Sequence, residues 1–173
     1  MPLPTTDRLT IRPAVVADAS ALFELRRQAL RNYPEAFSSD QTREDARGVA
    51  FWAQRIEDVA ESVIYVAAAG PDLVAMTGVY RESQAKLHHL AAVWGVYVQP
   101  EYRGRGLATQ MIDAGIAWAR ERDVLMLKLA VVTTNTAAIR CYVRAGFRVY
   151  GVEPKALQHD SVFYDELLMA LEL

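Results

Sequence analysis

The feature that most constrains the fold is a junction between a strand and a helix in the middle of the chain. Residues 96–109 read VYVQPEYRGRGLAT, which is an apolar run, a turn with a proline, a glycine-rich segment and the start of a helix. Leu107, Met111 and Trp118 recur at steps of four and seven residues and give the helix one apolar face. A β-rich run, residues 125–132, follows. The unit therefore predicts two parallel strands joined by a right-handed crossover.

The glycine-rich segment has the properties of an anion-binding site. A helix start leaves backbone N–H groups without partners and carries about half a positive charge. Gly104 and Gly106 lack a Cβ, so a ligand can approach those N–H groups closely. Arg103 and Arg105 add positive charge. A phosphate or pyrophosphate is the simplest ligand, although the same residues also suit an ordinary tight turn.

Two familiar phosphate loops are excluded. The P-loop ends in Gly-Lys followed by Ser or Thr, and this sequence has no such ending after its glycines. A dinucleotide-binding loop has a third glycine where this chain has Thr109. It also has an acid after the next strand, where this chain has Val132, Thr133 and Thr134. A dinucleotide-dependent oxidoreductase is therefore disfavoured.

A second motif lies downstream of the loop. Residues 135–147 read NTAAIRCYVRAGF, with the spaced pattern Asn-x-x-Ala-x-x-x-Tyr-x-x-x-Gly-Phe. With both motifs the sequence resembles the GNAT superfamily of acyl-CoA-dependent N-acyltransferases. The loop pattern of that family is Arg/Gln-x-x-Gly-x-Gly/Ala, and residues 103–108, RGRGLA, match it at every position. The two motifs cover the last half of the chain, whereas the first half matches only in pattern.

Hydrophobic periodicity and turn residues predict the other elements. A single α/β (α+β) domain is expected over residues 1–173. The resemblance implies a GNAT-like mixed, mostly antiparallel sheet of about seven strands, with a central splayed parallel pair and about four helices. The predicted elements are strand 8–13, helices 17–31 and 42–59, hairpin strands 62–69 and 73–80, strand 90–98, helix 104–121, strand 125–132, helix 135–145, strand 147–152, a loop containing Pro154, His159 and Asp160, and strand 162–171.

Several local details are also predicted. Asp18 is expected to cap the first helix. Thr42 and Asp45 have the spacing of a capping box for the second helix. The residues expected to share an apolar face are Val49, Trp52, Ile56 and Val59 in the second helix, and Leu125, Leu127, Leu129 and Val131 in the strand after the central helix.

Composition excludes several classes of protein. The net charge of −2 and the pI of about 5.9 argue against general binding to nucleic acid or to anionic membranes. No apolar run approaches the ~18 residues of a membrane span, and the first residues lack the pattern of a signal peptide. The single cysteine, Cys141, forms no internal disulfide, which fits the cytoplasm. The three histidines lack metal-ligand spacing, so no metal is expected.

The resemblance implies acetyl-CoA as co-substrate, with coenzyme A as its product. The pantetheine arm is expected to pair with the backbone of Val96, Tyr97 and Val98 as another strand would, although ordinary sheet pairing also explains these residues. Asn135 is expected to hydrogen-bond the arm, to cap its helix, or to do both. The pyrophosphate is expected on the backbone N–H groups of Arg103, Gly104, Arg105, Gly106, Leu107, Ala108 and Thr109.

Tyr142 is the candidate catalytic residue. It follows Asn135 by seven residues, two helical turns, so both can face one cleft. Its phenol, with an ordinary pKa of about 10, can donate a proton as a thiolate leaves. A place in the apolar core is the alternative role.

The general base is left unassigned, because many family members have a glutamate where this chain has Ala92. The candidates are a water chain, His88, His89 and Glu35.

The resemblance implies transfer of acetyl to a primary amine of a small molecule or peptide, by direct attack in a ternary complex. The acceptor pocket is expected between residues 34–37 and 153–164, with Glu35, Asp40 and Glu153 as acids that could attract a cationic amine. Because of Ala92, a non-catalytic acyl-CoA sensor or interaction module is the alternative. GNAT proteins are often dimers, so a homodimer is also consistent. The sequence does not identify the acceptor or the acyl chain.

Overall fold

The structure is a computed structural model that describes residues 9–173, so Arg8 of the predicted first strand lies outside it. The elements follow the predicted order. Their bounds are β1 Leu9–Pro13, α1 Ala19–Asn32, α2 Gln41–Glu57, β2 Ser62–Ala69, β3 Asp72–Arg81, β4 Leu90–Val98, α3 Leu107–Arg120, β5 Met126–Val132, α4 Thr136–Arg144, β6 Arg148–His159 and β7 Val162–Glu172, with short 3-10 turns η1 Val16–Asp18, η2 Pro34–Ala36 and η3 Pro100–Tyr102.

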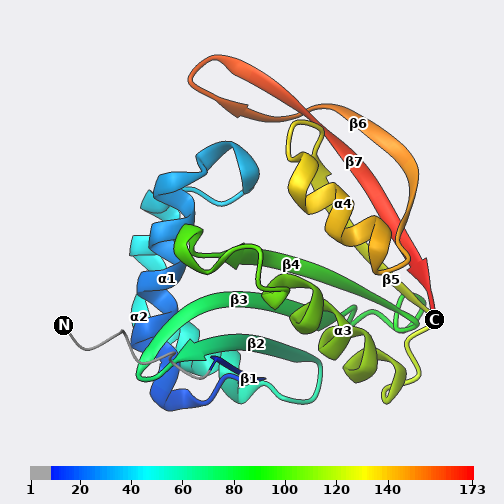
Figure 1. The fold of residues 1–173 in the computed structure, drawn as a ribbon. Helices are drawn as coiled ribbons and strands as arrows, with labels where there is room; N and C mark the ends of the chain where they lie inside the picture. The colour runs from blue at the N-terminus through cyan, green and yellow to red at the C-terminus, as the bar shows by residue number, and fades with distance from the viewer. Residues whose placement is uncertain (1–8) are drawn as a thin grey trace.

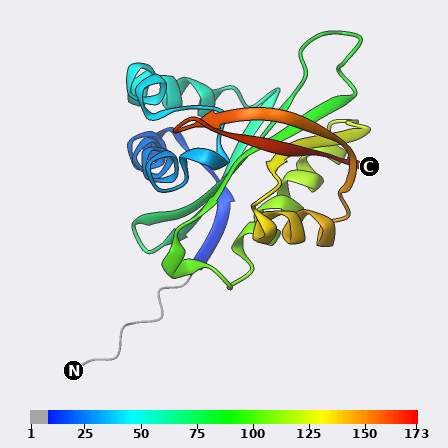
Figure 2. The same ribbon diagram turned by 90° about the horizontal axis from the view of Figure 1, so that it is seen from above.

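The strands form one mixed sheet in the order β1-β2-β3-β4-β5-β7-β6. All neighbours are antiparallel except β4 and β5, which are parallel and joined through α3. Helices α1 and α2 cover one face of the sheet, and α3 and α4 cover the other (Figures 1 and 2). This confirms the predicted fold class of seven strands with a central parallel pair and four helices. No helix within residues 9–173 is long and apolar enough to cross a membrane.

Each face of the sheet has its own apolar core, as the periodicity of the helices predicts. On one face, Leu22 of α1 and Trp52 of α2 are buried in a cluster with Met76 of β3. On the other, Ile112 of α3 and Leu127 of β5 are buried together. Side chains packed from both faces therefore fix where the central strands β4 and β5 lie.

The parallel strands β4 and β5 separate soon after they meet. They pair only from Leu90–Met126 to Ala92–Lys128. Beyond that point β4 contains a bulge, because Gly95 and Val96 together lie opposite Thr77 of β3. Gly95 has φ +64°, a conformation that glycine adopts without strain. A bulge bends its strand, so β4 turns away from β5 and the splayed pair follows (Figure 1).

Helix α2 differs from the prediction at both ends. Asp40 caps it by accepting a hydrogen bond from the backbone N–H of Arg43 at 2.8 Å. Thr42 and Asp45 therefore lie inside the helix, and Asp45 pairs with Arg27 at 2.6 Å. The capping box was wrong because an aspartate placed just before the helix competes better for its free amides.

The predicted apolar faces are also shorter than expected. Helix α2 has a non-helical residue at Gly48, with φ +65°, and ends at Glu57. Val49 is consequently 38% exposed, and Val59 lies beyond the helix and is 68% exposed. Of the four residues predicted for the apolar face, only Trp52 and Ile56 are buried. In the same way Leu125 precedes β5 and is 58% exposed, while Leu127, Leu129 and Val131 are buried as predicted.

Two further expectations are modified. Asp18 stands at the N-cap position of α1, but its side chain makes no cap bond and instead pairs with Arg12 at 2.6 Å. Strand β6 extends to His159 and includes Pro154, which was expected in a loop. A register shift between Glu153 and Leu157 lets an edge strand accommodate the proline, which has no N–H to donate.

The contact between Gly78 of β3 and Trp94 of β4 generates a stability prediction. A Cβ at Gly78 would lie 2.1 Å from the Trp94 indole, so Gly78→Ala should displace the ring and lower the free energy of unfolding by about 1–3 kcal/mol. Urea denaturation measures this loss. Gly151→Ala is the matched control in β6, because its Cβ would make ordinary contact with Leu168 at 3.6 Å. Equal stability of the two variants would contradict the packing described.

Candidate functional site

The loop before α3 presents a row of free backbone amides. Gly104 and Gly106 both have φ +75°, and Gly106 stands at the N-cap of α3 without a side-chain cap. Within residues 9–173, the backbone N–H groups from 104 to 109 donate to no protein acceptor, whereas the N–H of Arg103, which was predicted to belong to this row, donates to the Pro100 carbonyl oxygen at 3.2 Å. A Cβ built at Gly104 would meet nothing within 4 Å, so the loop is open on that side. These amides can therefore receive an anion.

The two arginines of the loop are held differently. The Arg103 Nε donates to the carbonyl oxygen of Val98 at 3.0 Å, and its guanidinium lies 4.8 Å from the centre of the Tyr33 ring. The Arg105 guanidinium lies 5.2 Å from the Tyr102 ring centre and 3.5 Å from the Glu101 carbonyl oxygen. Arg103 therefore joins the loop to the end of β4, while Arg105 lies over η3.

Strand β4 offers an unpaired edge beside this loop. Val98 and Tyr97 pair with Ala75 and Met76 of β3 on one side. On the side of β5, pairing stops at Ala92, so residues 93–98 have no strand partner there within residues 9–173. The structure thus brings Val96, Tyr97 and Val98 together with the amide loop at one end of the gap between β4 and β5.

Helix α4 brings the second motif next to the first. Asn135 caps α4, as predicted, by accepting from the Ala138 N–H at 3.2 Å. Thr109 Oγ1 in the first turn of α3 lies 3.5 Å from Cys141 Sγ, so the two helices are in contact beside the loop. Cys141 is half-buried.

Tyr142 lies in the apolar core of the α3/α4 face. Its side chain is 6% exposed, and its ring centre is 6.2 Å from that of Phe147. Burial raises the pKa of the Tyr142 phenol well above its usual range, because a phenolate would lose its hydration there. Tyr142 therefore stays protonated at neutral pH and keeps an O–H group that can donate a hydrogen bond or a proton.

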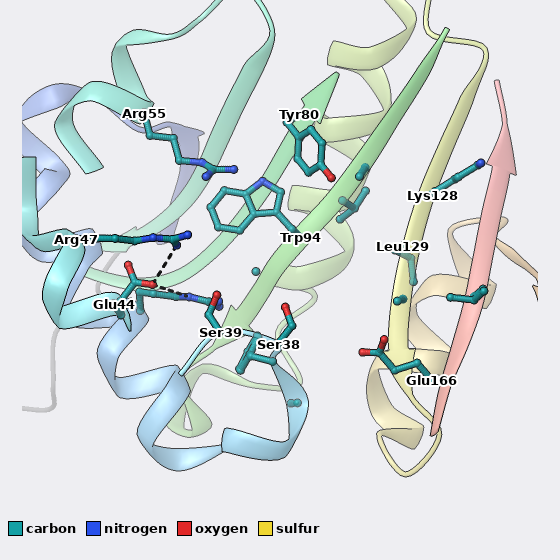
Figure 3. Close-up of a pocket in the computed structure, with 18 of the residues that line it drawn as sticks. Ser38, Ser39, Glu44, Arg47, Arg55, Tyr80, Trp94, Lys128, Leu129 and Glu166 are labelled. Atoms are coloured by element: carbon teal, nitrogen blue, oxygen red, sulfur yellow. Dashed lines mark ion pairs between the residues drawn. The ribbon is translucent and has the colours of Figure 1, made fainter. Parts of the chain in front are cut away.

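A pocket of about 520 Å³ opens on the α1/α2 face, where β4 and β5 separate. Residues 92–95 of β4 and 128–130 of β5 line its floor. Figure 3 shows α2 side chains on one side and β5 and β7 side chains on the other. Its charged lining residues are Arg26, Arg47, Arg55, Lys128, Glu44 and Glu166. A second hollow, of about 490 Å³, lies between α1 and the β2–β3 turn, away from this gap.

One side of the pocket is formed by three arginines around a buried glutamate, and we call this group, Arg26, Arg47, Arg55 and Glu44, the arginine wall. Glu44 is fully buried and accepts a hydrogen bond from Trp52 Nε1 at 2.7 Å. Its other oxygen lies 3.9 Å from Arg26 Nε and 3.7 Å from Arg47 Nη1. Glu44 thus holds two of the cations in place from α2.

The other side carries Lys128 of β5 and Glu166 of β7. Burial raises the pKa of the Glu166 carboxyl, and the nearby charge of Glu153 adds to the increase. Glu166 is therefore a stronger base than an exposed glutamate. Sequence reasoning did not select it, because only the pairing of β7 with β5 places it in the pocket.

The bases and acids named from the sequence are not in this pocket. His88 lies 3.3 Å from Glu61, and neither His88 nor His89 is among the lining residues. Glu35, Asp40 and Glu153 do not line it either, so the expected acidic attraction is replaced by the arginine wall. Ala92 does line it. Within the described part of the chain, no three His, Cys, Asp or Glu side chains are grouped to hold a metal.

The comparison with known protein families matches the part of the chain that contains these residues. The model of the acetyltransferase (GNAT) family matches residues 22–147, which include the loop and all of α4. The chain is 33% identical over 78 residues to the L-methionine sulfoximine/L-methionine sulfone acetyltransferase of Pseudomonas aeruginosa, covering 45% of each chain. It is 39% identical over 79 residues to the L-2,4-diaminobutyric acid acetyltransferase of Streptomyces coelicolor, covering 42% of this chain and 44% of the relative. The matches thus span less than half of these relatives.

Solved structures share the whole fold. A GCN5-related N-acetyltransferase from Kribbella flavida superposes with a TM-score of 0.81 at 27% identity, covering 98% of this chain and all of the other. A Salmonella typhimurium protein solved with its cofactor acetyl-CoA superposes with a TM-score of 0.83 at 24% identity, covering 96% and 94%.

Proposed function

The chain belongs to the GNAT family of acetyltransferases, and from this premise we propose that it moves the acetyl group of acetyl-CoA to a primary amine as a single domain. The observation that carries the proposal is the row of free amides at residues 104–109 beside the unpaired edge of β4. One elongated ligand with a diphosphate and an amide-containing arm would satisfy both groups of donors. The Salmonella neighbour, whose cofactor is acetyl-CoA, supports this choice.

The cofactor is proposed to lie along β4, in the gap between β4 and β5. Its diphosphate would accept hydrogen bonds from the amides of Gly104 to Thr109, where the helix dipole also favours negative charge. Its pantetheine arm would pair with the free side of Val96–Val98, as a strand pairs with a sheet edge. The thioester then reaches the point where β4 and β5 separate, which is also the floor of the pocket.

Tyr142 and Asn135 are proposed to act at the arm and the sulfur. Asn135 already caps α4 through its oxygen, which leaves its amide N–H groups for the arm. Tyr142 would donate its phenolic proton toward the sulfur as the thiolate leaves, since it stays protonated at neutral pH. The acceptor amine attacks the thioester carbon directly in a ternary complex.

Glu166 is proposed as the general base. It lines the pocket from β7, and its raised pKa brings it closer to the pH at which the enzyme works. The attacking amine must lose one proton, and one proton must end on the sulfur. A carboxylate on one side can take the proton that the amine loses, and a phenol on the other can hydrogen-bond the departing thiolate until that proton reaches it.

The loop placement predicts the effect of Gly106→Glu. The added carboxylate would lie where the diphosphate binds, in a backbone with φ +75° that disfavours any side chain, so affinity for coenzyme A should fall by about 100-fold or more. Isothermal titration with coenzyme A measures it. Gly48→Glu is the matched control, because Gly48 has φ +65° with open space around it in α2. Equal loss in both variants would refute the site at the loop.

The proposed donor predicts the effect of Tyr142→Phe. The variant should keep its affinity for acetyl-CoA and lose about 100-fold in kcat, since only the donor to the departing sulfur is removed. Thiol release in the presence of an amine panel measures kcat, and circular dichroism checks the fold. Unchanged kcat would mean that Tyr142 has only a structural role.

The same assay tests the alternative function. Binding of acetyl-CoA without turnover of any amine by the native protein would favour an acyl-CoA sensor.

The proposed base predicts a pH dependence. A carboxyl group accepts a proton only when ionised, so kcat/KM of the native enzyme should fall as pH falls through the raised pKa of Glu166. Glu166→Gln should remove this acidic limb and lower the plateau by about 100-fold. Rates measured across pH with one amine test both statements. A limb at the pKa of Glu166 that persists in Glu166→Gln would mean that another group is the base, whereas the limb set by the pKa of the amine itself is common to both enzymes.

A further inference from the structure

We propose that the acceptor carries an oxyanion, with a carboxylate as the first choice, in addition to its amine, and that the arginine wall binds it. The inference rests on the proposed function and names the class of its acceptor: a small anionic amine such as a free amino acid. Three features of the pocket carry it, namely its charge, its unpartnered donors and the position of its walls.

The first feature is an excess of positive charge. Three guanidinium groups, those of Arg26, Arg47 and Arg55, line the pocket together with the single carboxylate of Glu44, which pairs with only the first two. Burial lowers the pKa of Arg26 to about 10, and the neighbouring charges of Arg47 and Arg55 add to the decrease against the opposite effect of Glu44. Burial and Arg47 also lower the pKa of Arg55. An anion among these groups would relieve their mutual repulsion.

The second feature is a set of buried donors that lack acceptors. Arg26 has a side chain only 6% exposed, and its Nε and Nη1 make no hydrogen bond within residues 9–173. The same holds in the described chain for Arg55 Nε and for Trp94 Nε1. A buried donor without an acceptor is costly. A carboxylate has two oxygens that accept several hydrogen bonds each, and it could satisfy such donors together.

Stacking on aromatic rings does not account for these donors. The Arg55 guanidinium lies 4.1 Å from the Trp94 ring centre, and that of Arg47 lies 4.6 Å from the Phe51 ring centre. A ring face has no oxygen or nitrogen atom to accept these N–H groups, so they remain available to an oxyanion, which arginine can bind through two parallel hydrogen bonds.

The third feature is the separation of charge across the pocket. Glu166 lies on the wall opposite Arg47 and Arg55, on the far side of the gap between β4 and β5 (Figure 3). An acceptor with its anion on the arginine wall would direct its amine toward Glu166 and toward the proposed thioester. The volume of about 520 Å³ is that of a small-molecule pocket. An amine and an oxyanion on one small molecule match this arrangement.

The test compares amino acids with their uncharged derivatives. The standard L-amino acids, their methyl esters and their carboxamides are titrated into the protein saturated with coenzyme A, and acetylation is followed with acetyl-CoA. At least one amino acid should bind about tenfold or more tightly than its ester and its amide. Esters and amides have the less basic amines and are the more reactive nucleophiles at neutral pH, so a preference for the acid cannot arise from the amine.

Variants of the arginine wall test whether it causes the preference for the free acid. Arg55→Gln and Arg47→Gln should each weaken binding of the preferred acid about tenfold and raise its KM, with no change for its carboxamide or for acetyl-CoA. Arg43→Gln is the matched control, since Arg43 is exposed on α2 and does not line the pocket. Equal binding of acids and amides by the native protein, or equal loss for both in the variants, would overturn the proposal.

The binding measurement separates this proposal from the proposed function. Tight, arginine-dependent binding of an acid without acetyl transfer would support the oxyanion site and refute the transferase. Acetylation of amides and esters as readily as acids would support the transferase and refute the oxyanion site. Failure of every acid to bind to the complex with coenzyme A would also refute the site.

Discussion

The separation of β4 from β5 is the constraint on which the rest of the structure depends. Two parallel strands normally satisfy each other's backbone groups, yet these two pair for only three residues, from Leu90 to Ala92 on β4. The bulge at Gly95 bends β4, and the packed helices on both faces hold the bend in place. The unpaired edge of β4 carries a solvation cost unless a ligand replaces the missing strand. A gap held open in this way also connects the two faces of the sheet.

The two faces of the sheet present positive charge by different means. On the α3/α4 face, backbone amides and a helix dipole act at residues 104–109, and no side chain needs to be buried. On the α1/α2 face, three arginines gather, which is tolerable because Glu44 is buried among them and fixed by Trp52. A buried cation without such a partner costs several kcal/mol. The arginine wall therefore needs Glu44 for its stability, while its remaining positive charge is available for a ligand.

Local features explain what could be predicted from the sequence. The strand Leu90–Val98 and the cap by Asn135 each depend on neighbours within a few residues, and the structure confirms them, whereas the helix predicted from residue 104 begins at Leu107. The arginine wall could not be predicted, because Arg26 and Arg47 lie on different helices that meet only through packing. Glu166 was missed for the same reason, since strand pairing places it. Glu35, Asp40 and Glu153 were named as acids that could attract a cationic amine, but none of them lines the pocket, whose arginine wall comes from α1 and α2.

The burial of Tyr142 bears on how a phenol could assist the departing sulfur. Burial raises the pKa of the phenol, which makes it a weaker acid. In water the pKa is about 8.5 for a thiol and about 10 for tyrosine. The same dry surroundings would also raise the pKa of a thiol, so the phenol remains the weaker acid of the two. Complete transfer from the phenol to the thiolate then stays uphill by about 2 kcal/mol. The proposed role of Tyr142 is therefore mainly a hydrogen bond to the forming thiolate, which needs no matched pKa values. The proton that finally rests on sulfur can come from the amine, which has one to lose.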